Sequence, residues 1–253
     1  SLETTIAGES LFNDGVGVVV FTVILSLATG SAHSHINVSE IFLLFIEEAF
    51  GGIVYGFVLG YIFYRLLKSI DNYAVEILLT LSLVMGGYSL AYFLHVSGPL
   101  AMVVAGLFIG NHGKVFAMSE VTHKQLFSFW GLIDEFLNAV LFVLIGIEIL
   151  VISFSLNYLF IGIIIIPIIL CIRFIGVATP LIIMRERANL VKGASKAMTW
   201  CGLRGGISIA LALSIPDVPE KPLILAVTYI VVAFSILVQG LSSKKLVDHI
   251  LKD

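Results

Sequence analysis

The residues best suited to chemistry lie near the start of the chain, in the sequence GESLFNDG at residues 8–15. In a helix Glu9 would neighbour Asn13 and Ser10 would neighbour Asp14, so all four side chains share one flank. Carboxylate and hydroxyl oxygens bind hard cations, and a carboxylate in a partly dry site can bind a proton instead. The segment therefore predicts a sodium site at Asp14, Glu9 and Ser10 that can also hold a proton. Acidic caps at a helix start remain the alternative for both carboxylates.

Two arginines lie within otherwise apolar sequence, Arg173 and Arg204. A charged group at membrane depth requires a partner or a polar cavity. Glu9 is the favoured partner of Arg173. The full set of candidate partners is Glu9, Asp14, Glu76, Asp134, Glu135 and Glu148. A structural ion pair and a role in shaping an ion site are both open for each arginine, and the two readings are compatible.

Eight apolar segments must position these side chains. They cover residues 6–29, 40–67, 73–95, 98–110, 125–151, 157–184, 196–214 and 222–243. Crossing a bilayer takes about 20 helical residues, and lipid cannot satisfy the backbone of an open sheet. The sequence therefore predicts an all-α polytopic membrane protein with about eight transmembrane helices, of which the fourth is unusually short.

Glycines and cysteines within these segments give more local expectations. Gly202, Gly205 and Gly206 surround Arg204, which predicts a helix that unwinds there, as discontinuous helices do at transporter ion sites. The other glycines predict close helix packing, and they are Gly51, Gly52, Gly56, Gly60, Gly86 and Gly87. Cys171 and Cys201 are expected to be small buried hydrophobes without a disulfide.

Composition and charge narrow the class of protein. Apolar residues make up 59% of the chain and charged residues 12%, against about 25% charged in a soluble domain. The net charge of -3 excludes a nucleic-acid partner, and the sequence contains neither a His-Glu-x-x-His motif nor a nucleotide-binding glycine loop, so an enzyme is not expected. With both ends cytoplasmic, eleven of the fourteen basic residues fall in inside loops, which favours that orientation in the inner membrane.

The GESLFNDG segment resembles the monovalent cation/proton antiporters, specifically the bacterial sodium/proton antiporters related to the eukaryotic sodium/proton exchangers. Further similar segments follow in order along the chain. They are VEILLT at residues 75–80, HVSGPLA at 95–101, LIGIE at 144–148 and WCGLRGG at 200–206. The similarity therefore runs along the whole chain.

The resemblance implies a fold of around thirteen helices in two inverted repeats, with two unwound helices crossing near the ion site. It implies that Asp14 is the alternating carrier of ion and proton, with Asn13, Glu9 and Ser10 beside it. Arg173 would be the core arginine, and Arg204 would lie on the second crossing helix. A homodimer without a cofactor is also implied. Because the family's first crossing helix should precede residue 9, we expect residues 1–253 to be a single transport domain that is incomplete at its amino end.

The function predicted from these observations is electroneutral sodium/proton antiport by alternating access, with cytoplasmic sodium exchanged for external protons. Asn13 stands where a second Asp would add a titrating charge, which favours one-for-one exchange. Potassium/proton antiport by the same machinery is the main alternative, since ligand types do not fix ion radius. A cation channel or sensor subunit, and a structural membrane scaffold, are rivals from other classes.

Overall fold

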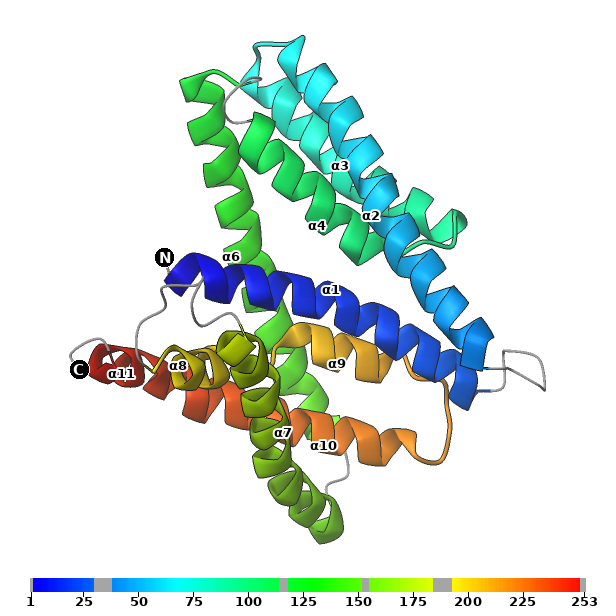
Figure 1. Ribbon diagram of the computed structural model, residues 1–253, viewed down its shortest axis with the longest axis vertical. Helices are drawn as coiled ribbons and strands as arrows, with labels where there is room; N and C mark the ends of the chain where they lie inside the picture. The colour runs from blue at the N-terminus through cyan, green and yellow to red at the C-terminus, as the bar shows by residue number, and fades with distance from the viewer. Residues whose placement is uncertain (1, 30–37, 114–117, 152–154, 184–192, 251–253) are drawn as a thin grey trace. The chain divides into compact units, whose positions relative to one another are not determined.

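The computed structural model describes residues 2–29, 38–113, 118–151, 155–183 and 193–250, and every element of regular structure in these ranges is helical (Figure 1). In chain order the elements are α1 (Leu2–Ala28), α2 (Val38–Lys68), α3 (Tyr73–Phe93), α4 (Gly98–Phe108), η1 (Ile109–Gly113), α6 (Glu120–Val151), α7 (Leu156–Ile183), α8 (Ala194–Cys201), α9 (Gly206–Leu213), α10 (Lys221–Phe234), η2 (Ser235–Gly240) and α11 (Leu241–Ile250). Each predicted apolar segment corresponds to one helix or to consecutive helices. The all-α prediction is confirmed.

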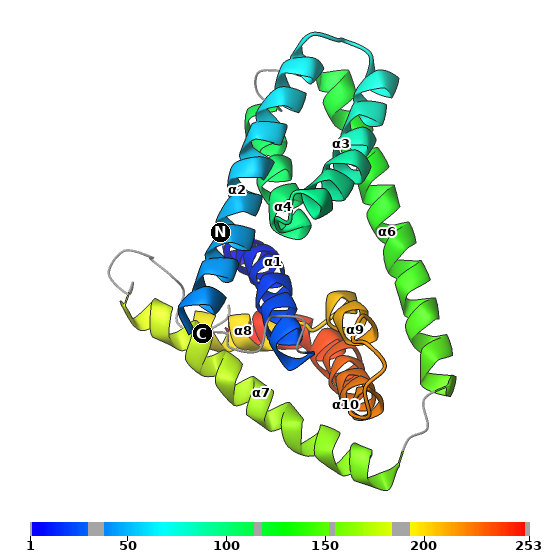
Figure 2. The same ribbon diagram turned by 90° about the vertical axis from the view of Figure 1, so that its right-hand side faces the viewer.

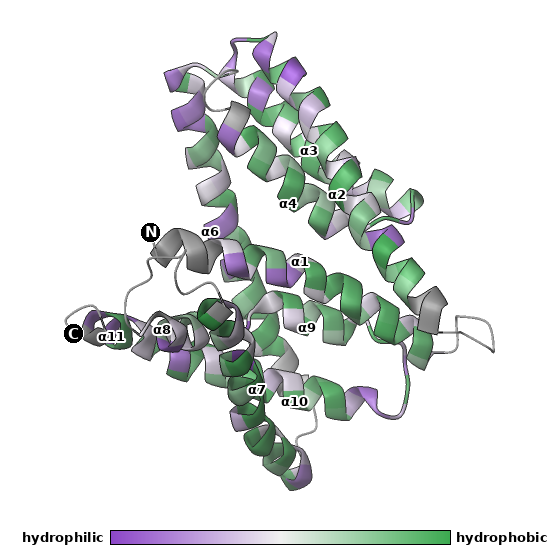
Figure 3. Ribbon diagram, viewed as in Figure 1, coloured by the Kyte–Doolittle hydropathy of each residue, from purple (hydrophilic) through white to green (hydrophobic). Residues whose placement is uncertain are grey.

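Helix length and composition identify the protein as polytopic. Six helical stretches among the described residues are long and apolar enough to cross a bilayer. Hydrophobic colour runs along the helices and hydrophilic colour gathers mostly near their ends (Figure 3). The fourth predicted segment forms a shorter apolar helix, Gly98–Asn111, and the seventh forms two helices of eight residues each. A total of eight crossings therefore stays a prediction.

The described chain divides into two compact units. Unit 1 comprises residues 1–10 and 139–253, and unit 2 comprises residues 11–138. The helices α1 and α6 each contribute to both units. Glu9, Arg173 and Arg204 all belong to unit 1. Contacts among these three residues therefore lie within one unit.

Unit 2 is organised by the close approach of α2 and α4, which run side by side in both ribbon views (Figures 1 and 2). A Cβ atom on Gly56 would overlap the carbonyl oxygen of Ala101, and one on Gly60 would lie 3.1 Å from the Cα of Ala105. Glycines spaced by four residues on α2 thus let backbone meet backbone, as in small-residue packing within membranes. The packing role predicted for Gly56 and Gly60 is confirmed, whereas the same prediction is wrong for Gly86, where a Cβ would meet nothing within 4 Å among the described residues.

The same unit has well-defined helix starts. The Asn72 side chain accepts a hydrogen bond from the backbone N–H of Ala74 at 3.0 Å and so caps α3. Ser97 caps α4 by accepting from the N–H of Leu100 at 3.4 Å, with Pro99 in the first turn. A buried apolar cluster closes the other end of the α2–α4 contact, formed by Leu67, Leu83, Ala105 and Ile109.

Unit 1 is built around α9 and α10. A buried cluster joins them, made of Ile209, Ala212, Leu225, Tyr229 and Val232. On α7, Gly162 leaves room for Ile230 of α10, because a Cβ at Gly162 would lie 2.7 Å from the Ile230 Cδ1. Helix α10 therefore packs against both α9 and α7.

The cysteine prediction is wrong in one respect. Both thiols are free, but Cys171 is exposed on α7 and Cys201 is only half-buried at the end of α8. Apolar neighbours in a membrane helix do not imply burial within protein, since a side chain that faces lipid has the same neighbours in sequence.

We expect Gly56→Ala to destabilise the protein, because the added methyl group would overlap the Ala101 backbone rather than a movable side chain. Overpacking of this kind costs about 1–3 kcal/mol. The control is Gly86→Ala, since a Cβ there meets nothing within 4 Å among the described residues. Thermal unfolding of the purified protein should show a lower midpoint for Gly56→Ala alone, and equal midpoints would contradict the packing argument.

Candidate functional site

The predicted interruption around Arg204 is present. Helix α8 ends at Cys201 and α9 begins at Gly206, so residues 202–205 form an unwound segment between two short helices. The Gly202 backbone lies at φ -75° and ψ 72°, and the N–H of Leu203 donates to the carbonyl of Cys201 at 2.9 Å. These values describe an inverse γ-turn, which turns the chain sharply directly after α8.

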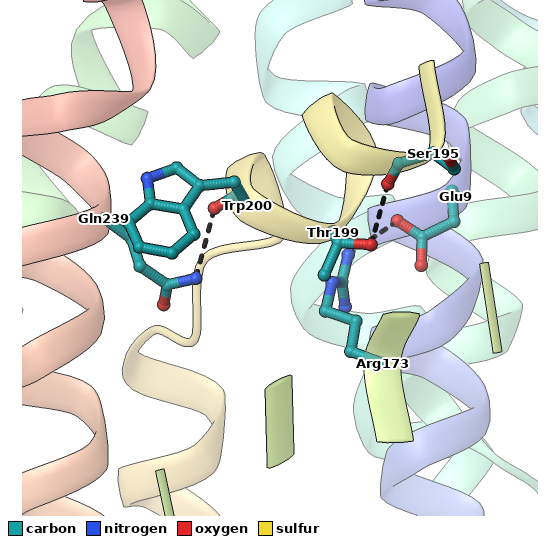
Figure 4. A network of polar contacts seen from close by, with 6 residues as sticks. All are labelled: Glu9, Arg173, Ser195, Thr199, Trp200 and Gln239. Atoms are coloured by element: carbon teal, nitrogen blue, oxygen red, sulfur yellow. Dashed lines mark hydrogen bonds and ion pairs between the residues drawn. The ribbon is translucent and has the colours of Figure 1, made fainter. Parts of the chain in front are cut away.

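Arg173 of α7 reaches the amino-terminal part of α1. Its Nη2 lies 2.9 Å from Oε2 of Glu9, and the two side chains are 9% and 29% exposed (Figure 4). This contact joins the two residues that the sequence analysis paired. Since removing one partner of a buried ion pair leaves an uncompensated charge, the two side chains depend on each other.

Gly202 provides the space in which the Arg173 guanidinium lies. A Cβ on Gly202 would overlap Cζ of Arg173, so an added methyl group would force the guanidinium out of its present position. The φ of Gly202 is one that any residue adopts, so the requirement for glycine comes from the close approach and not from the backbone conformation. The position of the unwound segment and the geometry of the ion pair therefore depend on each other.

Polar side chains from η2 meet the unwound segment. The backbone N–H of Arg204 donates to Oγ of Ser235 at 2.8 Å, and Nε2 of Gln239 donates to the carbonyl of Trp200 at 3.2 Å (Figure 4 for Gln239). Helix ends leave backbone groups without intrahelical partners, and these two contacts satisfy two such groups at the break. Trp200 also contacts α11, since its indole N–H donates to Oγ of Ser242 at 2.8 Å.

The remaining predicted site residues occupy defined places on α1 and next to the break. Ser10 is half-buried in unit 1, while Asn13 and Asp14 are exposed on the part of α1 that belongs to unit 2. Arg204 is half-buried within the unwound segment. The sodium site at Asp14, Glu9 and Ser10 stays a prediction.

The other candidate partners of the arginines are found elsewhere. Glu76 is fully buried in α3 of unit 2, and Asp134 and Glu135 are exposed on α6. The Glu148 side chain lies outside the described residues.

Ser235 and Gln239 were not identified from the sequence. Both are buried, at 1% and 4% exposure, in the middle of an apolar span. The available signal was their spacing, because two polar residues four apart in an apolar run fall on one face of a helix. That signal indicates a polar contact but does not say with which backbone groups.

The sequence matches known proteins along nearly its whole length. A sequence profile of the family described as "Sodium/hydrogen exchanger, transmembrane" matches residues 1–249. The chain is 50% identical over 254 residues to the Na(+)/H(+) antiporter NhaP of Pseudomonas aeruginosa, covering 98% of this chain and 59% of that protein. It is 35% identical over 253 residues to the Na(+)/H(+) antiporter NhaH of Halobacillus dabanensis, covering 98% and 61%.

The chain belongs to the sodium/hydrogen exchanger family. It is also 32% identical over 226 residues to sodium/hydrogen exchanger 8 of Arabidopsis thaliana, with 85% of this chain and 29% of that protein covered. The chain spans about three-fifths of the length of the two bacterial antiporters. The resemblance inferred from GESLFNDG and the later segments is confirmed, and the family is one of transporters rather than enzymes.

We expect Gly202→Ala to displace the Arg173 guanidinium and break its contact with Glu9. A hydrogen bond to a charged group contributes about 1.5–3 kcal/mol, so the free energy of unfolding should fall by about that amount. Gly205→Ala is the matched control in the same segment, because a Cβ at Gly205 meets nothing within 4 Å among the described residues. Thermal unfolding followed by tryptophan fluorescence compares the two variants.

A double-variant cycle tests whether Gly202 acts through the ion pair. If it does, Gly202→Ala combined with Glu9→Gln should be little less stable than Gly202→Ala alone, since both changes remove the same contact. Fully additive losses would show that Gly202 stabilises the protein in some other way.

Proposed function

We propose that the natural full-length protein is a sodium/proton antiporter that exchanges cytoplasmic sodium for external protons by alternating access. The observation that carries the proposal is the engagement of Glu9 by Arg173 at 2.9 Å, at the start of the segment that also contains Asp14. The bacterial relatives named as Na(+)/H(+) antiporters support the choice of ions. We assign Asp14 as the residue that carries sodium and the proton alternately.

Competition for one carboxylate explains the coupling. On the cytoplasmic side Asp14 releases its proton and binds sodium, and the helices that carry it then expose the site to the outside. There sodium leaves and Asp14 takes up an external proton before the return step. Sodium and the proton occupy the same carboxylate in turn. Each ion therefore crosses the membrane only when the other crosses in the opposite direction.

The neighbouring residues take supporting roles in this proposal. Glu9 and Ser10 contribute oxygen ligands to sodium, and Asn13 lies beside Asp14 on the same flank of α1. Arg173 balances the charge of Glu9, so that Glu9 adds no second transported proton. Arg204 shapes the unwound segment between α8 and α9.

The location of the chain in the membrane and its oligomeric state are part of the same proposal. We place the chain in the inner membrane with both ends cytoplasmic, as the distribution of basic residues favours. Residues 1–253 would form part of a single transport domain, and the protein would act as a homodimer.

Replacing Asp14 by Asn should abolish sodium-driven proton movement, because the amide can neither bind a proton at neutral pH nor supply a negative charge to sodium. The measurement is the collapse of an imposed pH gradient on sodium addition, in proteoliposomes that contain the natural full-length protein. Asp217→Asn is the control, since Asp217 is 99% exposed and forms a surface ion pair with Lys221 one turn away. That variant should retain full activity.

Three outcomes would contradict the assignment. Equal responses of the wild type and Asp14→Asn would exclude Asp14 as the carrier. Sodium flux without proton movement in the wild type would indicate a channel. A response to potassium and none to sodium would show that the cation was assigned wrongly.

The exchange should be electroneutral. Moving one net charge across the membrane potential changes the free energy by about 2.3 kcal/mol per 100 mV, so an electrogenic antiporter would respond strongly to voltage. We expect the initial rate to be nearly unchanged when a potassium diffusion potential of either sign is imposed with valinomycin. A rate that follows the sign of the potential would rule out one-for-one exchange.

A further inference from the structure

The unwound segment between α8 and α9 is held from one side by a single neighbouring helix. Within the segment, the N–H of Gly202 still donates to the carbonyl of Met198 at 3.2 Å, and the N–H of Leu203 donates to the carbonyl of Cys201. The carbonyl of Trp200 and the N–H of Arg204 lie on either side of the sharp turn at Gly202, and each bonds to a side chain of η2. The turn is thus fixed at both of its ends.

The two side chains that fix it are Ser235 and Gln239, four residues apart in η2. They are 1% and 4% exposed, which removes water as a competing partner for the same backbone groups. The element η2 is a π-helical stretch between the α-helical α10 and α11. Such π-helical turns within α-helices occur frequently at functional sites.

The contacts continue from the unwound segment to α1. Gly202 lies in the turn that Ser235 and Gln239 fix, and the Arg173 guanidinium occupies the space where its Cβ would be. The same guanidinium holds Glu9 at 2.9 Å. A displacement of the turn would therefore move Arg173, and Arg173 would move the Glu9 carboxylate.

We propose that Ser235 and Gln239 are positioning residues for sodium binding, which act by fixing the turn at Gly202 and, through Arg173, the carboxylate of Glu9. The transport part of this inference rests on the proposed antiport function. Neither residue touches sodium in this scheme. Loss of either side chain should weaken the binding of sodium more than it slows the exchange step.

The first experiment measures the turn itself and needs no transport. Cys201 is the last residue of α8, next to Gly202, and its half-buried thiol can report opening of the turn through its rate of alkylation by N-ethylmaleimide. The protein is the natural full-length chain in membrane vesicles, with every other cysteine, including Cys171, replaced by alanine. Ser235→Ala and Gln239→Leu should each raise the alkylation rate by up to about tenfold, as expected for the loss of one buried hydrogen bond.

Two further variants serve as controls. Ser243→Ala removes a hydroxyl in the first turn of α11 that donates to the carbonyl of Gly240, three residues earlier and away from the turn at Gly202, and it should leave the rate unchanged. Ser235→Thr keeps the hydroxyl oxygen that accepts from Arg204, and it should restore the rate towards that of the wild type. Should Gln239→Leu fail to fold, Ser235→Ala deletes a single oxygen atom and still decides the question.

The second experiment measures sodium-dependent proton movement for the same variants. We expect the sodium KM to rise about tenfold in Ser235→Ala and Gln239→Leu, with kcat changed by less than about twofold and with Ser235→Thr close to the wild type. A lower kcat at an unchanged KM, or an unchanged pair of constants, would overturn the positioning role. An alkylation rate equal to that of Ser243→Ala would overturn the fixing of the turn. Absence of sodium-driven proton movement in the wild type would instead refute the proposed function, and the alkylation result would stand separately.

Discussion

The arrangement of unit 1 depends on placing one arginine inside a membrane protein. Arg173 is 9% exposed on a strongly apolar helix, and a charge taken out of water costs several kcal/mol unless it is paired. Pairing requires Glu9, and the approach of the guanidinium requires a glycine at position 202. An unwound segment in turn needs partners for its backbone, which Ser235 and Gln239 provide. The buried arginine thus requires Glu9 and Gly202, and the unwound segment at Gly202 requires Ser235 and Gln239.

Much of unit 1 could be predicted from the sequence because the relevant signals are local. An arginine in an apolar run indicates a carboxylate partner, and three glycines around Arg204 predict an unwound helix. Ser235 and Gln239 could not be assigned in the same way, since their partners are backbone groups that become available only where the helix breaks. The exposure of Cys171 was missed because hydropathy does not distinguish a side chain facing lipid from one facing protein.

The glycine contact between α2 and α4 also determines what unit 2 can do mechanically. Backbone lies against backbone at Gly56 and Ala101, so no side-chain rotamers lie between the helices there to rearrange and let one slide past the other. We therefore expect the two helices to move together as one rigid body. Any shape change within unit 2 has to take place at contacts filled by flexible side chains, and a mutation that loosens the α2–α4 contact would add a degree of freedom that the native protein lacks.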